Sequence, residues 1–323
     1  MKSRKWMLLI GVTGVLALGV AACGDDDSGS TDSTSAEGGG DVSGTIAIDG
    51  SSTVAPLSEL AAELFQEENP DVRVTVGTSG TGGGFEKFCV GETQISDASR
   101  PIDEEEMAMC EENGITQEQI TVANDGLAVV VNPENPVDCL TVDQLSQIWD
   151  KGSKVSNWSD IDGLDVDYNE SLELFGPGTD SGTFDYFTEA INGEEGQQRT
   201  DYNNVGEDDN QTVRGVSGNP GGIGYFGLSF AEENSDTLKL LQVDGGDGCV
   251  TPTVETVQDG SYTPLGRGLF IYPSGDALED PAVDAFIEFY IENAQSIAEQ
   301  ALFVPLTDEQ VTEAQDKVDS LIG

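Results

Sequence analysis

The chain has 323 residues, enough for about two domains or one large two-lobed domain with a real hydrophobic core. It carries 61 acidic and 13 basic residues, a formal charge of −48, and a surface this acidic repels nucleic acids and anionic lipids. Histidine is absent, which excludes the Ser-His-Asp triad, the Cys-His dyad and His-ligated metal sites. Most hydrolase mechanisms are thereby removed.

Residues 1–22 are predicted to be an export signal. A positively charged start, MKSRK, precedes an apolar run that ends in small residues and is short for a stable membrane span. The stretch LGVAAC resembles a bacterial lipoprotein signal, in which Cys23 is lipidated and becomes the new N-terminus. The alternative is an ordinary cleaved signal that leaves a free thiol at Cys23.

Residues 23–44 are predicted to be a disordered acidic tether. They consist mostly of Asp, Ser, Thr and Gly, with almost nothing to bury. Removing the signal also removes Lys2, Arg4 and Lys5 from the 13 basic residues, so 10 basic residues then face 61 acidic ones. The exported chain is therefore even more acidic than the full sequence.

From residue 45 to 323 the hydrophobic pattern alternates between strands and amphipathic helices. Strands are predicted at 45–49, 72–76, 94–96, 127–131, 172–175 and 269–272. Helices are predicted at 54–66, near 85, and at 103–113, 142–149, 183–191, 281–302 and 308–321, with a polar loop over 192–210. This order indicates an α/β fold with mainly parallel sheets.

The segment NPGGIGYFG contains G-x-G-x-x-G spacing at Gly222, Gly224 and Gly227. A turn at Asn219-Pro220 precedes it instead of a strand, so a dinucleotide site is not indicated and a glycine-rich hinge is favoured. No G-x-x-x-x-G-K-[ST] phosphate-binding loop occurs. We expect neither a cofactor nor a metal.

Four cysteines follow the signal, and an even number in an exported chain predicts two disulfides. They are Cys89, Cys110, Cys139 and Cys249. Three connectivities are open; proximity favours Cys89–Cys110, which leaves Cys139–Cys249 as the long-range pair. The alternative is four buried free thiols.

Three strand–turn–helix transitions have turns rich in Gly, Ser and Thr. The residues in them that could bind an anion are Ser52 and Thr53; Ser79, Gly80 and Thr81; and Asp180, Ser181, Gly182 and Thr183. The first turn of a helix has unpaired N–H groups and a partial positive charge, and hydroxyl side chains add donors. Each turn alone is explained by helix capping, but three in one chain favour a shared anion site.

An anion removed from water also needs a cation, and the mature chain has only five arginines. Arg100 follows a short strand and precedes a helix, the position at which α/β sheets present ligands, and its planar fork suits an oxyanion. The alternative role for Arg100 is an ion pair with neighbouring carboxylates. Arg199, in the polar loop, is a second candidate.

Several segments together resemble the phosphate-binding lipoproteins of Pst-type ABC transporters, which have the type II periplasmic-binding-protein fold. The resemblance rests on DGSSTVAP, VGTSGTGGGFEKFC, ISDASRPI, NDGLAVVVN, LTVDQLSQIW, LFGPGTDSGTFDYFTEAI and GVSGNPGGIGYFG. The segments are spread between about residues 45 and 305 in the order and spacing of the family, so the resemblance extends over nearly all of the globular chain.

The resemblance implies two lobes that close on a ligand by a hinge. The first lobe would comprise about 45–125 and the chain from about 230, and the second about 126–229. Ser52, Thr53, Ser79, Gly80 and Thr81 would bind phosphate from the first lobe, together with Ser99 and Arg100. Ser181, Gly182 and Thr183 would bind it from the second.

The sequence departs from the family pattern at two positions. Ser99 stands where better-known members have an aspartate, and Pro177 stands where they have an arginine. Arg100 would replace the missing arginine, with help from Arg199. Asp180 is the nearest candidate to accept the phosphate proton, with helix capping as its alternative role and Asp201 or Asp209 as replacements.

The function that follows is capture of inorganic phosphate outside the cytoplasm and its delivery to an ABC-type permease, without chemistry. We expect a monomer anchored to the cell membrane by lipid at Cys23, with no nucleic-acid partner. The alternatives are a binding protein for sulfate or molybdate, and a secreted phosphate-ester hydrolase with Ser181 or Ser52 as nucleophile.

Overall fold

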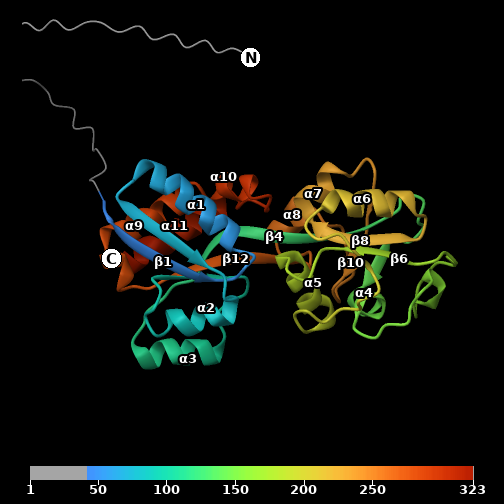
Figure 1. Ribbon diagram of the computed structural model, residues 1–323, viewed down its shortest axis with the longest axis horizontal. Helices are drawn as coiled ribbons and strands as arrows, with labels where there is room; N and C mark the ends of the chain where they lie inside the picture. The colour runs from blue at the N-terminus through green and yellow to red at the C-terminus, as the bar shows by residue number, and fades with distance from the viewer. Residues whose placement is uncertain (1–41, 323) are drawn as a thin grey trace, which may run out of the picture. The chain divides into compact units, whose positions relative to one another are not determined.

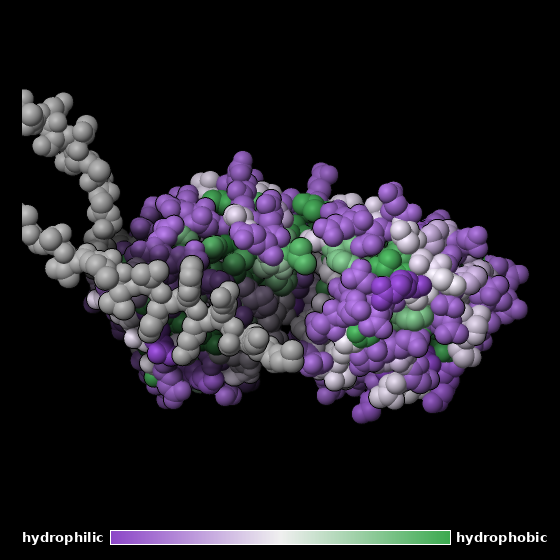
Figure 2. Space-filling view, turned by 45° about the horizontal axis from the view of Figure 1, so that its top comes forward, coloured by the Kyte–Doolittle hydropathy of each residue, from purple (hydrophilic) through white to green (hydrophobic). Residues whose placement is uncertain are grey.

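The computed structural model describes residues 42–322. The predicted export signal, Cys23 and nearly all of the predicted tether lie outside these residues. Within the described part of the chain, no helix is both long and apolar enough to cross a membrane. Hydrophilic residues cover most of the face in Figure 2, and the hydrophobic ones form small separate groups.

The main sheet is mixed, not mainly parallel as the sequence predicted. Its strand order is β2-β1-β3-β12-β4-β8-β6-β7, with β9 paired to β4. The strands are β1 (Gly44–Gly50), β2 (Val72–Gly77), β3 (Ile95–Ala98), β4 (Ile120–Val131), β6 (Glu173–Gly176), β7 (Asn203–Asn204), β8 (Gly222–Gly227), β9 (Lys239–Leu240) and β12 (Gly266–Pro273). The pairs of β1 with β2 and β3 and of β6 with β7 and β8 are parallel, whereas β12 and β4 pair antiparallel with their neighbours.

A second, small sheet has the order β11-β10-β5. It consists of β5 (Cys139–Thr141), β10 (Gln242–Asp244) and β11 (Cys249–Val250). A disulfide joins Cys139 to Cys249 in this sheet, and another joins Cys89 to Cys110. Both predicted pairs are therefore confirmed.

Eleven α-helices are described within residues 42–322, whereas the sequence predicted seven. Most of the predicted helices begin and end within a few residues of their observed bounds, and those at Asp209–Gly218, Leu228–Glu233 and Val254–Gln258 were not predicted. The helices are α1 (Ala55–Glu68), α2 (Thr81–Phe88), α3 (Glu104–Asn113), α4 (Val142–Trp149), α5 (Gly182–Asn192), α6 (Asp209–Gly218), α7 (Leu228–Glu233), α8 (Val254–Gln258), α9 (Pro281–Glu292), α10 (Ala294–Gln300) and α11 (Asp308–Ile322). The single helix predicted at 281–302 is divided at Asn293, whose side-chain amide donates to the Phe289 carbonyl. Such a side-chain bond competes with continuation of the helix.

The segment NPGGIGYFG is not a hinge; its residues 222–227 form β8, an inner strand of the main sheet. Helix α6 packs on β8, and the glycines allow the close approach. A Cβ at Gly224 would lie 2.5 Å from Thr212 Cγ2, and one at Gly222 would lie 2.8 Å from Val216 Cα. The glycine spacing therefore serves packing.

Two large hydrophobic cores share the main sheet. The first core is formed by residues between Ile46 and Ala123 and between Leu269 and Val318, and α1 and α9 pack against each other beside β1 (Figure 1). The second core is formed by residues between Leu127 and Leu265, with Val304 added. Strand β4 runs from one core to the other, and β12 begins directly after Leu265 of the second core and contributes Leu269 and Ile271 to the first.

The second core extends well beyond residue 230. Leu238, Val243, Tyr262 and Leu265 are all buried in it, although the sequence reading assigned the chain after about 230 to the first lobe. We therefore propose that the chain returns to the first lobe at about residue 266, within β12. The glycines and arginine at 266–268 then lie at the crossing between the two cores.

Candidate functional site

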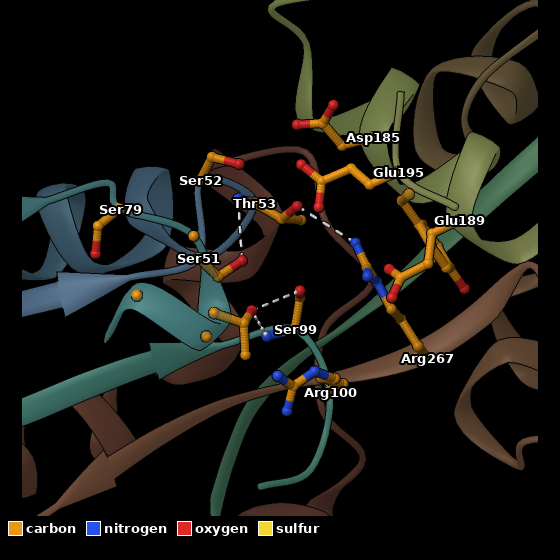
Figure 3. A pocket seen from close by; sticks show the side chains of 15 residues that line it. Ser51, Ser52, Thr53, Ser79, Ser99, Arg100, Asp185, Glu189, Glu195 and Arg267 are labelled. Carbon is orange, nitrogen blue, oxygen red and sulfur yellow. Dashed lines mark hydrogen bonds between the residues drawn. The ribbon is translucent and has the colours of Figure 1, made fainter. Parts of the chain in front are cut away.

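A polar cavity of about 380 Å³ is bordered by the loops after β1, β2 and β3, by α5, and by β12 (Figure 3). Its lining consists of Ser51, Ser52, Thr53, Ser79, Gly80, Thr81, Gly82, Gly83, Ser99, Arg100, Asp185, Tyr186, Glu189, Glu195 and Arg267. Strands β1, β2 and β3 are parallel, so the loops after them meet at one edge of the sheet. All seven anion-binding residues predicted in the first lobe line this cavity.

The loop after β1 is fixed to the sheet and to its own helix. The Ser51 amide donates to the Asp97 carbonyl over 2.9 Å, and the Ser51 hydroxyl accepts from the Thr53 amide over 3.2 Å. Helix α1 begins two residues after Thr53, with a proline in its first turn. This arrangement holds the hydroxyls of Ser52 and Thr53 at the rim of the cavity.

The loop after β2 is held by Asp49, at the end of β1. The Asp49 carboxylate accepts from the Ser79 amide over 3.0 Å, from its hydroxyl over 2.5 Å and from Lys87 Nζ over 2.6 Å. Burial raises the pKa of Asp49, but the hydrogen bonds from Lys87 and Ser79 outweigh burial and hold it below its usual value. Ser79 thus donates its hydroxyl proton to Asp49, and its role in the site is to hold the loop.

Arg100 lines the cavity, but both of its terminal nitrogens already donate to protein groups. Its two terminal nitrogens donate to the two oxygens of Glu106, each over 2.8 Å, and Nη1 also donates to the Pro101 carbonyl. The hydrogen bonds from Arg100 to Glu106 raise the pKa of the guanidinium above its usual value. The ion pair that was the alternative role of Arg100 is present, and it lies at the edge of the cavity.

Arg267 is a second arginine in the cavity lining, and the sequence did not predict it as a site residue. Its Nε donates to Asp125 over 3.3 Å, its Nη2 donates to Thr53 Oγ1 over 3.3 Å, and its guanidinium carbon lies 3.4 Å from the centre of the Tyr186 ring. Within residues 42–322, Nη1 of Arg267 donates to no protein group. Because Arg267 also lines the cavity, these N–H groups are available to an anion.

Asp125 holds the Arg267 guanidinium in place by accepting a hydrogen bond from its Nε. The two residues are opposite each other in the β4–β12 pair, and their side chains are only 8% and 15% exposed. Burial raises the pKa of Asp125, and the charge and hydrogen bond of Arg267 oppose that rise. The guanidinium is therefore held in one orientation, between the two cores, before any ligand arrives.

The third predicted turn contributes in a different way from the first two. Ser181 is buried, and Gly182 begins α5 so close to the first loop that a Cβ there would lie 3.1 Å from Thr53 Oγ1. Neither Ser181, Gly182 nor Thr183 borders the cavity. From this part of the chain the cavity is bordered instead by Asp185, Tyr186 and Glu189 of α5 and by Glu195.

Two predicted residues lie elsewhere. Arg199 is buried, donates to both oxygens of Asp201 over 2.7 and 2.9 Å, and also donates to the Ile148 and Val155 carbonyls. It holds the loop after α5 to the second core and does not border the cavity. Asp180 is exposed and also lies outside the cavity lining.

The two replacement acceptors also lie outside the cavity lining. The hydrogen bonds from Arg199 lower the pKa of Asp201 to about 2. Burial raises the pKa of Asp209, the first residue of α6, to about 6. Neither carboxylate is placed to contact an anion in the cavity.

The missed residues had weak sequence signals. Arg267 lies between Gly266 and Gly268, just before the strand predicted at 269–272, and it is one of only five arginines after the signal. Asp185 and Glu189 are one helical turn apart in a predicted helix that begins with Ser-Gly-Thr. Nothing in the local pattern separates them from the many other carboxylates.

Among the described residues, no group of three or more Asp, Glu or Cys side chains is placed to hold a metal ion. The polar groups in the cavity lining are hydroxyls, backbone groups near two helix N-termini, two arginines and three carboxylates. Such a set can bind a small oxyanion by hydrogen bonds and charge.

Comparisons with known proteins show the family to which the chain belongs. The family model described as "PBP superfamily domain" matches residues 35–294. Protein SphX of Synechococcus elongatus is 46% identical over 84% of this chain and 80% of its own length, and the phosphate-binding protein PstS of Staphylococcus saprophyticus is 40% identical over 99% and 96%.

Among solved structures, one described as a possible phosphate binding protein from Planctomyces limnophilus has a TM-score of 0.83 and 43% identity. It covers 87% of this chain and 100% of its own. PstS from Borrelia burgdorferi has a TM-score of 0.64 and 25% identity, covering 81% of this chain and 99% of its own. The chain therefore belongs to the Pst-type phosphate-binding protein family of the PBP superfamily.

Proposed function

We propose that the protein captures inorganic phosphate outside the cytoplasm and delivers it to the permease of an ABC transporter. The relative from Staphylococcus saprophyticus, at 40% identity, is named a phosphate-binding protein, and a further structure of this fold, from Clostridium perfringens, has bound phosphate. The observation that carries the proposal is the cavity itself, in which three hydroxyl-bearing loops meet two arginines. In this role the protein binds and releases its ligand and performs no reaction.

The geometry supports capture by replacement of the hydration shell. Hydroxyls of Ser52, Thr53 and Thr81 and the amides at the start of α2 would donate to phosphate oxygens, and Arg267 would supply the charge. Arg267 also contacts Thr53 on one side and Tyr186 on the other. An anion bound to Arg267 would therefore be held between the two cores.

The competing functions make different predictions. A sulfate- or molybdate-binding protein would bind those anions at least as tightly as phosphate in titration calorimetry. A phosphate-ester hydrolase would turn over a chromogenic ester and lose that activity in Ser181→Ala or Ser52→Ala. The phosphate-binding function predicts one phosphate per chain, weaker sulfate and molybdate, and no turnover.

The anchor and the location are part of the same proposal. The signal-like sequence that ends at Cys23 supports a lipid-modified N-terminus, with the residues between Cys23 and β1 as a tether to the outer face of the cell membrane. The two disulfides agree with an oxidising compartment. We expect the protein to act as a monomer, with the permease as its protein partner.

A further inference from the structure

A buried carboxyl group lies directly behind the loop that follows β1. Asp97 is the third residue of β3, and its side chain is completely buried. Its backbone carbonyl accepts from the Ser51 amide over 2.9 Å, and Gly50 lies so close that a Cβ there would collide with the same oxygen. The loop that carries Ser52 and Thr53 (Figure 3) therefore rests on Asp97.

The Asp97 side chain holds the helix that follows this loop. Its Oδ1 accepts from the Ser58 hydroxyl over 2.9 Å, and that hydroxyl also lies 3.2 Å from the Tyr290 hydroxyl of α9. Ser58 is in the first turn of α1, and the N-terminus of α1 follows Thr53 at the rim of the cavity. One residue of β3 thus holds the loop through its backbone and the helix through its side chain.

The surroundings of Asp97 do not compensate a negative charge. Within residues 42–322, its Oδ2 has no hydrogen-bond partner and no ion pair includes it. The charged groups that face it are the carboxylates of Asp49 on β1 and Glu59 on α1, while Ile271, opposite it on β12, carries no charge. The Tyr290 phenol stays neutral, because burial raises its pKa well above the usual value. An uncompensated buried charge is costly, so the Asp97 carboxyl is neutral in the folded protein at neutral pH.

Ionisation of Asp97 opposes the binding of an anion in the cavity. Burial raises the pKa of Asp97 to about 8, and the hydrogen bond from Ser58 works against the rise. Above this pH the carboxylate places a negative charge beneath the first turn of α1. That charge competes with a bound anion for the positive N-terminal end of the helix, and it repels the anion through a medium of low dielectric.

We propose that Asp97 is a positioning residue of the anion site: its neutral form holds the loop after β1 and helix α1 in place, and its ionised form lowers the affinity for phosphate. It acts through these two elements and touches no ligand, since it does not border the cavity. The inference rests on the proposed function and adds to it an upper pH limit that the protein sets.

Few other groups ionise in the pH range in which Asp97 does. The chain has no histidine, and free phosphate is already mostly a dianion at pH 8. Lysine and tyrosine side chains titrate at about pH 10 or above. The raised pKa of Asp185 in the cavity lining, about 6, lies below this range. A fall in phosphate affinity above pH 8 is therefore expected from Asp97.

The test is titration calorimetry with phosphate at pH 7.5, 8.5 and 9.5, with near-UV circular dichroism to show that the protein is native at each pH. The parent should lose about tenfold in affinity over this range, because a single linked ionisation changes Kd by at most about tenfold per pH unit. Asp97→Asn keeps an oxygen that accepts from Ser58 and cannot ionise. It should bind phosphate at pH 7.5 within about threefold of the parent and change by less than about twofold up to pH 9.5.

Two further variants separate this role from a merely structural one. Ser58→Ala deletes the hydrogen bond that opposes the raised pKa of Asp97, so the loss of affinity should begin at a higher pH than in the parent. Asp284→Asn, in the first turn of α9, is the matched control. It changes a carboxyl that also has one buried oxygen without a partner among the described residues, and it should follow the parent at every pH.

Four results would overturn the proposal: equal affinity of the parent at all three pH values, an equally steep loss in Asp97→Asn, a loss that begins at lower pH in Ser58→Ala, or a changed profile in Asp284→Asn. A parent that binds no phosphate at any pH would instead refute the proposed function.

Discussion

Removing the Arg267–Asp125 pair should weaken phosphate binding far more than removing the Arg100–Glu106 pair. The variants are Arg267→Gln with Asp125→Asn, and Arg100→Gln with Glu106→Gln. Each double change deletes one ion pair and leaves the net charge constant, so no buried carboxylate is left without its cation. Glutamine at position 106 also preserves the capping box of α3 with Asp103.

The size of the difference follows from the free donors of each guanidinium. Arg267 has an unbonded Nη1 that borders the cavity, and loss of a desolvated, charge-assisted partner costs about 2–5 kcal/mol, or about 30-fold to several-thousand-fold in Kd. Arg100 has both terminal nitrogens bonded to Glu106, so its removal should cost less than about tenfold. Titration calorimetry with phosphate measures the Kd of each double variant, and thermal melts show whether each variant is folded. A larger loss in the Arg100 variant, or a loss under threefold in the Arg267 variant, would refute the assignment.

Three further predictions concern stability and location. Replacing Cys139 and Cys249 by alanine removes a bridge between residues 110 apart and should reduce the free energy of unfolding by about 4–5 kcal/mol. Replacing Cys89 and Cys110, which are 21 residues apart, should reduce it by about 3 kcal/mol. Equal or reversed losses in denaturant titrations would contradict this account. Burial raises the pKa of Asp97 to about 8, so the folded state binds the proton more tightly than the unfolded state does. The free energy of unfolding should therefore fall as pH rises from about 4 to 8, by at most about 1.4 kcal/mol per pH unit. Asp97→Asn should reduce this slope, and an unchanged slope would exclude Asp97 as its source. Cys23→Ser should release the protein from membranes with phosphate binding intact, and a variant that still sediments with membranes would rule out the lipid anchor.

The sequence predicts those parts of the site that depend on local patterns. Hydroxyl-rich turns before helices predict that Ser52, Thr53 and Thr81 lie together, and all three border the cavity. Strand, turn and helix are neighbours in the chain, and the carboxyl ends of parallel strands meet at one edge of a sheet. Elements with a clear hydrophobic period were predictable for the same reason, whereas the short helices α6, α7 and α8 and the strand β8 were not predicted. Helix α4, at Val142–Trp149, begins and ends where its hydrophobic period predicts.

The parts that depend on distant pairing were not predictable. Arg267 and Asp125 are 142 residues apart and become neighbours only through the antiparallel β4–β12 register. The sequence made Arg199 a candidate for binding the anion, but in the fold its Nη1 donates to the carbonyls of Ile148 and Val155, which are distant in the sequence. The position of β12 between the two cores likewise depends on the order of the strands in the sheet, and hydrophobic periodicity alone does not predict that order.

The most direct test of the account is titration calorimetry of the purified protein with phosphate, sulfate and molybdate at neutral pH. The account predicts one phosphate per chain and much weaker binding of the other two anions. A site that leaves a buried polar group unmatched by the wrong ligand can reach about 10⁴–10⁵-fold discrimination. No heat with phosphate, or equal affinity for sulfate, would contradict the account.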